Sequence, residues 1–316
     1  MASTLGLLIL GLVILLAGGE LLVRAASRLA LLLGLSPLII GLTVVSFGTS
    51  SPELVVSLQS AWSGQPDIAL GNVVGSNIAN ILCILGLSAL IAPLPCAPSL
   101  LSRDVPLMIL TSLLLVALSA NGSIERIEGL FLFACLVAQT IFAVRGERIP
   151  PAELLSGTGL NPKRTSAVFW LCAVIIAGLV LLSFGADMFT EAASQMARMF
   201  GVSELTIALT VVALGTSLPE LVTSGIAAFR GHSDIALGNV VGSNIFNILS
   251  VLGLSALLTP VDVSQVARDF DIPVMLLVAL ILLPLLRSRL RLSRIEGAVL
   301  LIGYLVYIRH LLMAGS

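Results

Sequence analysis

The sequence has little charge. Asp, Glu, Lys and Arg make up only 10% of its 316 residues, whereas a soluble domain of this length carries about a quarter. Hydrophobic residues make up 58%, and the mean hydropathy is +1.12. Soluble packing cannot hide so much apolar surface, but a lipid bilayer allows the outer face to be apolar as well. The net charge of −1 and the lack of a basic stripe argue against a nucleic-acid-binding protein.

Residues for metal and nucleophilic chemistry are equally scarce. His232 and His310 are isolated, and we assign them no role. The sequence has no HExxH motif, no nucleophile elbow, and no serine near a histidine inside an apolar run. We therefore expect neither an enzyme nor a bound cofactor. Four cysteines without CxxC spacing are interpreted as packing residues: Cys83, Cys96, Cys135 and Cys172.

Ten apolar runs are long enough to cross a bilayer, which takes about 20 helical residues. The first run follows no basic segment and no cleavage pattern, so we expect a retained span rather than a signal peptide. The runs 4–32 and 165–199 are unusually long and should be strongly tilted. The predicted spans are 4–32, 37–62, 67–92, 104–120, 124–145, 165–199, 203–229, 234–258, 271–287 and 294–313.

Lys and Arg predict the orientation. If the N-terminus is outside, 12 of them fall on the inner side and 4 on the outer side, in line with the positive-inside rule. Both termini are then extracytoplasmic. The inner set is Arg24, Arg28, Arg103, Arg145, Arg148, Lys163, Arg164, Arg230, Arg287, Arg289, Arg291 and Arg294, and the outer set is Arg126, Arg198, Arg268 and Arg309.

The chain repeats itself at an offset of 167 residues. Residues 42–57 read LTVVSFGTSSPELVVS and residues 209–224 read LTVVALGTSLPELVTS, with twelve of sixteen positions identical. Residues 67–82 and 234–249 read DIALGNVVGSNIANIL and DIALGNVVGSNIFNIL, with fifteen of sixteen identical. Chance does not produce such matches, so the chain consists of two related halves.

Each half has five predicted spans, so the second half must enter the membrane from the opposite side. Inverted repeats of this kind are common in secondary transporters and lead naturally to alternating access. The predicted fold is an all-α membrane protein of ten transmembrane helices, with a first repeat at 1–145 and a second at 164–316. A cytoplasmic linker rich in proline and glycine, 146–163, joins them.

Two acidic residues lie deep inside spans. Glu53 and Glu220 occupy equivalent positions, and an ionisable residue there is expensive and usually functional. Each follows a string that breaks helices, because proline removes a backbone donor and clashes with the preceding turn. The breaking residues are Gly48 and Pro52 in one string, and Gly215 and Pro219 in the other. We expect carbonyls near Ser46, Phe47, Ala213 and Leu214 to lose their helical partners and become available to a cation.

Polar residues at helical spacing accompany these glutamates. They fall at i, i+4 and i+8, so each set lines one face of a helix. The four faces should meet in the membrane. They are Thr49, Glu53 and Ser57; Thr216, Glu220 and Ser224; Asn72, Ser76 and Asn80; and Asn239, Ser243 and Asn247.

This set offers only oxygen ligands, which suits Ca²⁺ or Na⁺ and suits zinc or copper poorly. The two carboxylates would neutralise Ca²⁺ in a medium of low dielectric constant. For the glycines and for Ser57 and Ser224, helix packing is an equally good explanation. Other charges are less informative: Glu20 is expected to pair with Arg24 at i+4, and Asp104 starts a helix, where a carboxylate is favourable.

These motifs, GTSSPELVVS with GNVVGSNIANI and GTSLPELVTS with GNVVGSNIFNI, resemble the two repeats of the cation/Ca²⁺ exchanger superfamily. Over all ten spans the chain is similar to bacterial Na⁺/Ca²⁺ exchanger-like members of the YrbG type. The resemblance implies Ca²⁺ export driven by Na⁺, or by H⁺ in some branches. It also implies that two long tilted helices slide against an ion-binding core.

The resemblance assigns roles residue by residue. Glu53 and Glu220 match the central Ca²⁺ ligands. The carbonyls of Ser46 and Ala213 match flanking Na⁺ positions. Other matching ligands are Thr49, Ser50, Thr216, Ser217, Ser76, Ser243, Asn80 and Asn247. At the position of Asn247, well-studied Na⁺/Ca²⁺ exchangers carry Asp, so this chain presents two carboxylates rather than three.

Two carboxylates balance one Ca²⁺ but leave one charge of three Na⁺ uncompensated. Two protons also discharge a glutamate pair, so Ca²⁺/H⁺ exchange stays open beside Ca²⁺/Na⁺ exchange. A cation channel is a third class, but its pore usually needs symmetric assembly, and the internal duplication makes one chain self-sufficient. We expect a multi-pass protein of a bacterial inner membrane, whose partners are the lipid bilayer and the transported cations, with no obligate protein partner.

Overall fold

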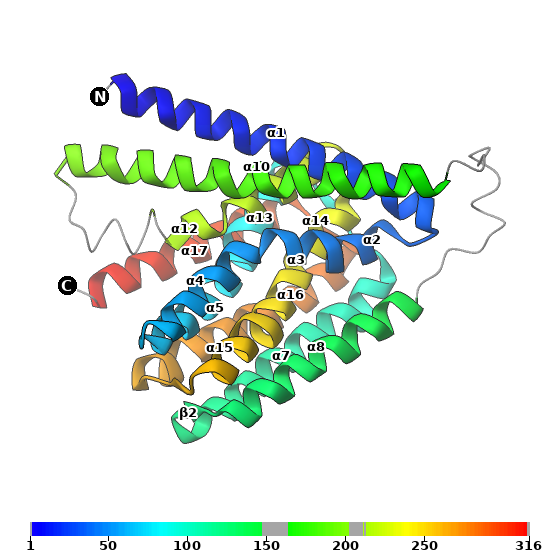
Figure 1. Cartoon of the computed structure of the whole chain (residues 1–316). Helices are drawn as coiled ribbons and strands as arrows, with labels where there is room; N and C mark the ends of the chain where they lie inside the picture. Colours follow the sequence, from blue (N-terminus) through cyan, green and yellow to red (C-terminus); the bar gives the residue numbers. More distant parts are fainter. Residues whose placement is uncertain (1, 147–163, 202–210, 212, 315–316) are drawn as a thin grey trace.

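The computed structural model describes residues 2–146, 164–201, 211 and 213–314. Nearly all of them are helical. Two long helices, α1 (Ala2–Leu33) and α10 (Arg164–Met199), pack against each other and cross over the remaining helices, which run at a steep angle to them (Figure 1). Most of the predicted linker, residues 147–163, lies outside the described residues.

The first repeat continues with short and bent helices. They are α2 (Pro37–Ile40), α3 (Ser46–Thr49), α4 (Ser51–Trp62), α5 (Pro66–Ala79), α6 (Gly86–Ile91), α7 (Val105–Leu118) and α8 (Arg126–Gly146). Wider π-helical turns join several of these at Gly41–Val45, Asn80–Leu85 and Leu100–Asp104, and a 3₁₀ turn lies at Ser119–Asn121. Two short strands complete the repeat, β1 (Leu94–Pro95) and β2 (Ser123–Ile124).

The second repeat follows the same plan. Its helices after α10 are α12 (Ala213–Thr216), α13 (Leu218–Phe229), α14 (Ser233–Phe246), α15 (Gly253–Leu258), α16 (Ile272–Arg289) and α17 (Arg294–Ala314). Its π-helical turns lie at Asn247–Leu252 and Ala267–Asp271, and its strands are β3 (Val261–Asp262) and β4 (Arg291–Leu292). The π turns at Asn80 and Asn247 are repeat equivalents, as are those at Leu100 and Ala267.

The described residues form eight helices long and apolar enough to span a membrane, and one further pair, Pro37–Thr49 with Ser51–Trp62, is bent by 44°. The seventh predicted span, 203–229, is represented by Leu218–Phe229, since most of its first part lies outside the described residues. Two spans begin four residues earlier than predicted, at Leu100 and Ala267. The π turns there hold polar residues, so the helix starts before the apolar run does.

The two repeats interlock. Strand β1 pairs antiparallel with β4, and β2 pairs with β3, so both short sheets join one repeat to the other. Helix α8 packs on α15, and α17 packs on α6. Glycines permit this close approach: a Cβ at Gly129 would lie 2.6 Å from the Gly253 carbonyl oxygen, and a Cβ at Gly297 would lie 2.7 Å from that of Gly86. The halves therefore share one core rather than forming separate domains.

Glycines also hold α1 against α10. A Cβ at Gly11 would lie 2.9 Å from the Phe189 backbone nitrogen, and a Cβ at Gly18 would lie 2.8 Å from the Gly178 carbonyl oxygen. In the same way, a Cβ at Gly178 would lie 3.0 Å from the Gly18 carbonyl oxygen, and a Cβ at Gly185 would lie 3.0 Å from that of Gly11. The helices are antiparallel repeat equivalents in backbone contact. The outer face of α10 exposes apolar side chains, including Ile176, Val180 and Phe184, as a lipid-facing helix does.

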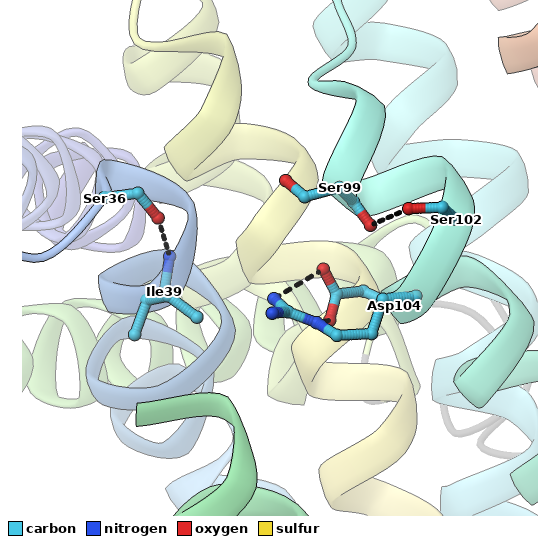
Figure 2. A network of polar contacts seen from close by, with 6 residues as sticks. Ser36, Ile39, Ser99, Ser102 and Asp104 are labelled. Carbon is cyan, nitrogen blue, oxygen red and sulfur yellow. Dashed lines mark hydrogen bonds and ion pairs between the residues drawn. The ribbon is translucent and has the colours of Figure 1, made fainter. Parts of the chain in front are cut away.

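Polar contacts fix the starts of α2 and α7 (Figure 2). The Ile39 backbone N–H donates to Ser36 Oγ at 3.3 Å, which caps α2. Asp104 is buried at the N-cap of α7, but its side chain makes no capping hydrogen bond. Arg103 Nε donates to Asp104 Oδ1 at 2.8 Å instead. Asp104 thus lies at a helix start, as expected, and it also forms an ion pair with Arg103.

Glu20 makes more contacts than the sequence predicts. It pairs with Arg24 as expected, and also with Arg230, whose Nη2 lies 2.5 Å from Glu20 Oε1. Arg230 follows α13, so this contact ties α1 to the second repeat. The i+4 pattern reveals only the local pair, because the contact with Arg230 depends on the tertiary fold. All four cysteines are free thiols, with Cys83 and Cys96 buried.

Candidate functional site

Both glutamates sit at breaks in helices. Ser50, with φ −84° and ψ 9°, leaves the helical conformation between α3 and α4. Ser217, with φ −89° and ψ 5°, does the same between α12 and α13. Pro52 and Pro219 lie in the first turn of the helices that follow, where proline is tolerated. Glu53 and Glu220 occupy the same first turns, where the helix dipole favours negative charge.

The carbonyls freed by these breaks differ from the prediction. Ser46 keeps a helical partner, because the Ser50 N–H donates to its carbonyl oxygen at 3.0 Å. The Phe47 carbonyl accepts from Ser51 Oγ at 2.9 Å. The expectation that Ser46 loses its helical partner is wrong, since proline removes the donor for the carbonyl four residues earlier, which is Gly48. The Phe47 carbonyl is not free either, because a side-chain hydroxyl occupies it. A carbonyl oxygen has two lone pairs, so Ser46 still has acceptor capacity. Ala213, its repeat equivalent, is the first residue of α12.

The carboxylates are held crosswise by the two repeats. Ser50 Oγ donates to Glu220 Oε1 at 2.8 Å, and Ser217 Oγ donates to Glu53 Oε1 at 3.2 Å. Each glutamate of one repeat thus binds the serine at the helix break of the other. Both glutamates are only 1% exposed, and they are close enough to interact electrostatically. The two acidic side chains therefore meet in the interior of the protein.

Five buried oxygens of the predicted ligand residues lack a hydrogen-bond partner among the described residues. They are Glu53 Oε2, Glu220 Oε2, Asn80 Oδ1, Asn247 Oδ1 and Ser243 Oγ. Buried polar atoms are nearly always satisfied, because leaving one unpaired costs about 1–3 kcal/mol. Two carboxylate oxygens, two amide oxygens and a hydroxyl make a ligand set for a hard cation. The described residues contain no cluster of three or more His, Cys, Asp or Glu side chains.

The neighbouring hydroxyls line the same interior. Ser76 Oγ lies 3.4 Å from Ser217 Oγ, beside Glu53. Thr49 donates to Asn239 Oδ1 at 3.1 Å and faces Glu220. Thr216 borders a cavity, described below, that also reaches Ser76. Of the predicted side-chain ligands, those described here all fall within one region where the two repeats meet.

Part of the predicted polar faces has a packing role. Asn72 Nδ2 donates to Ser57 Oγ at 2.9 Å, and Asn239 Nδ2 donates to Ser224 Oγ at 2.9 Å. These bonds join α4 to α5 and α13 to α14. For Ser57 and Ser224 the structure therefore supports the interhelical hydrogen bond over direct ion contact.

Sequence reasoning missed Asn77 and Asn244. Each lies one residue outside the i, i+4, i+8 spacing, yet both are buried and bonded across the repeats. The signal was present in the sequence, because both lie in the nearly identical motifs at 67–82 and 234–249. Their contacts with Asn80 and Asn247 could be found only from the fold.

Two cavities approach the site from different sides. One, of about 490 Å³, reaches Ser46 and Gly242, and the other, of about 430 Å³, reaches Thr216 and Gly75. Gly75 and Gly242 are repeat equivalents, at the offset of 167. Each cavity thus touches one of the two broken helices and the near-identical motif of the other repeat, at 234–249 or 67–82.

The walls of the cavities are also related. The RIEG strings at 126–129 and 294–297 align α8 with α17 at an offset of 168. Gln139 of α8 lines the first cavity, and its equivalent Tyr307 of α17 lines the second. The second cavity alone contains a carboxylate, that of Asp271, which accepts a hydrogen bond from the Tyr307 hydroxyl at 3.1 Å. Its equivalent Asp104 is engaged by Arg103 (Figure 2).

The profile of the sodium/calcium exchanger protein family matches residues 3–145 and 170–313. The chain belongs to this family. The exchanger is 40% identical over 316 residues to the inner membrane protein YrbG of Escherichia coli K12, covering 96% of this chain and 95% of the relative. It is 34% identical over 337 residues to the sodium/calcium exchanger MaX1 of Methanosarcina acetivorans, covering 96% of each.

A solved structure of the sodium-calcium exchanger NCX_Mj has the same fold. The TM-score is 0.84 at 30% sequence identity, with 98% of each chain covered. This match confirms the predicted all-α membrane fold of two inverted repeats, and family membership confirms that the exchanger is a transporter rather than an enzyme. The assignment of individual ligands stays a prediction.

Proposed function

We propose that this chain is a secondary antiporter that exports Ca²⁺ in exchange for Na⁺ by alternating access. The observation that supports the proposal most is the group of buried oxygens without hydrogen-bond partners, which includes one carboxylate oxygen each of Glu53 and Glu220. The family, and the names of MaX1 and NCX_Mj as sodium/calcium exchangers, support the choice of these two ions.

Ca²⁺ binds between the two carboxylates in this proposal. Glu53 and Glu220 cancel its two charges, which allows the ion to shed water in the protein interior. Asn80, Asn247 and Ser243 contribute their unpartnered oxygens. Ca²⁺ takes about six to eight oxygens, and the remaining ligands come from nearby hydroxyls. Thr49, Ser50, Ser76 and Ser217 already face the carboxylates, and Thr216 is included because it borders the cavity that reaches Ser76. The flanking carbonyls of Ser46 and Ala213 are the proposed Na⁺ positions.

The paired cavities support alternating access. Each touches one broken helix, and their walls come from equivalent elements of the two repeats. Exchanging the conformations of the repeats would close one route and open the other. Helices α1 and α10 are suited to act as one sliding unit, since their backbones are in contact while smaller surfaces join them to the broken helices. One such surface is Gly48, which faces the Leu179 side chain of α10.

Ca²⁺/H⁺ exchange is the second candidate, and Asn247 favours it. With an amide there, the described part of the site holds two carboxylates, which can be discharged by one Ca²⁺ or by two protons. Three Na⁺ would leave one positive charge to be balanced by carbonyl dipoles alone. The site thus fits the counter-transport of two protons or of Na⁺.

Uptake of radiolabelled Ca²⁺ into proteoliposomes separates the candidates. Vesicles loaded with Na⁺ and diluted into Na⁺-free medium should accumulate Ca²⁺ at constant pH. A pH gradient without Na⁺ should give little uptake. Uptake that follows the pH gradient and ignores Na⁺ would instead establish the proton-coupled form, and no uptake with either gradient would overturn the antiport proposal.

Replacing Asn247 by Asp should strengthen the dependence on Na⁺. The third carboxylate would compensate the charge of a third Na⁺. The measurement is the Na⁺ concentration that gives half-maximal Ca²⁺ uptake, which should fall. An unchanged Na⁺ activation curve would contradict this account of the charge balance.

The orientation proposed from Lys and Arg places both termini outside and linker 146–163 in the cytoplasm. YrbG is an inner membrane protein by name, which supports the same location for this chain. In this orientation the cavity that contains Asp271 faces outward, and the cavity that reaches Ser46 faces inward.

A further inference from the structure

Asn77 and Asn244 form a reciprocal pair in the buried interior. They are repeat equivalents, separated by the repeat offset of 167, and each donates its side-chain Nδ2 to the other's backbone carbonyl. The distances are 3.2 Å from Asn77 to Asn244 O and 3.4 Å from Asn244 to Asn77 O. Equivalent residues that bond to each other lie beside the axis relating the repeats.

These bonds determine which way both amides point. A backbone carbonyl only accepts, so Nδ2 of Asn77 must face Asn244 O, and its Oδ1 must point elsewhere. That Oδ1 accepts from Nδ2 of Asn247 at 3.1 Å. In the same way, Asn244 Oδ1 accepts from Nδ2 of Asn80 at 2.9 Å. Sulfur atoms of Met275 and Met108 lie beside the two Nδ2 groups at 3.7 Å and 3.5 Å.

The consequence reaches the proposed ion ligands. Because each Nδ2 donates to the neighbouring asparagine, Oδ1 of Asn80 and of Asn247 points the other way, and both Oδ1 atoms are buried and unpartnered. Without these acceptors either amide could turn by half a rotation and present N–H groups to a cation. Turning the amide of Asn80 or Asn247 is costly here, because it would break the bond to Oδ1 of Asn244 or Asn77. Those oxygens cannot turn away in response, since the Nδ2 group of the same amide is held by a backbone carbonyl.

We infer that Asn77 and Asn244 are positioning residues that orient the amide oxygens of Asn247 and Asn80 toward the transported cation. Each acts across the repeat boundary, so the two halves set each other's ligands. The π-helical turns begin at Asn80 and Asn247, one turn after the positioning residues, and such turns are frequent at functional sites. The inference rests on the proposed ion site, and it adds the residues that turn amide oxygens rather than N–H groups toward the ion.

Replacing Asn77 by Leu tests this role, since Leu has a similar size and accepts no hydrogen bond. The KM for Ca²⁺ should rise about tenfold or more, the usual effect of losing a residue that orients a metal ligand. The maximal uptake rate should change far less. Ser88→Ala is the matched control, because Ser88 is a buried polar residue of α6 outside the site.

The decisive comparison repeats Asn77→Leu in the Asn247→Asp background. A carboxylate has two equal oxygens and no wrong orientation, so the second substitution should remove the need for Asn77. We expect the added effect of Asn77→Leu on KM to shrink to no more than about twofold there. An equal loss in both backgrounds would indicate a general structural role and would overturn the inference.

The mirrored pair provides an independent version of the test. Asn244→Leu should raise the KM for Ca²⁺ in the wild-type background but not with Asn80→Asp, and it remains informative if Asn77→Leu does not fold. Failure of the ion site itself would look different, because wild-type protein would then transport no Ca²⁺. Normal wild-type transport with an unchanged KM in both leucine variants would reject the positioning role alone.

Discussion

Replacing either Glu53 or Glu220 by Gln is expected to abolish Ca²⁺ uptake. Glutamine keeps the size of the side chain and one oxygen, but it removes one of the two charges that balance Ca²⁺. Leaving a buried charge without its partner costs about 3–5 kcal/mol, which corresponds to a loss of affinity of about 100-fold or more. Ca²⁺ uptake into Na⁺-loaded proteoliposomes measures the effect, and each single variant should be as inactive as the double variant.

Glu191→Gln is the control for this experiment. Glu191 lies exposed on α10 and accepts a hydrogen bond only from Gln195 among the described residues. The control should transport at the wild-type rate. If Glu53→Gln and Glu220→Gln both kept wild-type uptake, the carboxylate pair would not be the Ca²⁺ site.

Replacing Gly18 by Leu is expected to cause the second-largest effect. A Cβ at Gly18 would lie 2.8 Å from the Gly178 carbonyl oxygen and 2.8 Å from the Leu182 backbone nitrogen. These are backbone atoms, so α10 must move as a whole to make room, and overpacking of this kind costs about 1–3 kcal/mol or more. Helices α1 and α10 should separate, with a lower melting temperature, a smaller yield of monodisperse protein and no transport.

Gly6→Leu is the control for Gly18→Leu. It tests whether the loss comes from the contact with α10 or from placing any leucine for glycine in α1. Gly6 lies on the same helix, but a Cβ there would meet nothing within 4 Å. This variant should fold and transport normally. Equal behaviour of the two variants would contradict the close backbone contact between α1 and α10.

The sequence alone predicts the fold well because two strong signals agree. Apolar runs place the spans, and the near-identical motifs at 67–82 and 234–249 reveal the duplication, whose odd number of spans requires inversion. What the runs do not reveal is where polar turns extend a helix, as at Leu100 and Ala267. They also do not reveal that α1 and α10 meet at glycines. A glycine in the sequence can lie in a loop, in a helix contact or on an exposed face, and the sequence does not distinguish these.

The site was predictable where residue type alone identifies it. A glutamate after a helix break, as at Glu53 and Glu220, is informative without a structure. The crossing of Ser50 to Glu220 and of Ser217 to Glu53 was not predictable, because helical spacing describes faces within a helix and not contacts between repeats. For the same reason Asn77 and Arg230 were missed. The prediction that the Ser46 carbonyl is freed was wrong by two residues. Pro52 lacks the N–H that would bond to the carbonyl four residues earlier, which is Gly48.

The central claim is that one divalent cation sits between the carboxylates of the two repeats. The most direct measurement is anomalous X-ray diffraction from crystals soaked in Sr²⁺, a heavier cation that also prefers oxygen ligands. The account predicts one strong anomalous peak within bonding distance of both Glu53 and Glu220, lost in the Glu53→Gln and Glu220→Gln variants. A strong peak elsewhere, or well-ordered crystals with no peak between these glutamates, would contradict it.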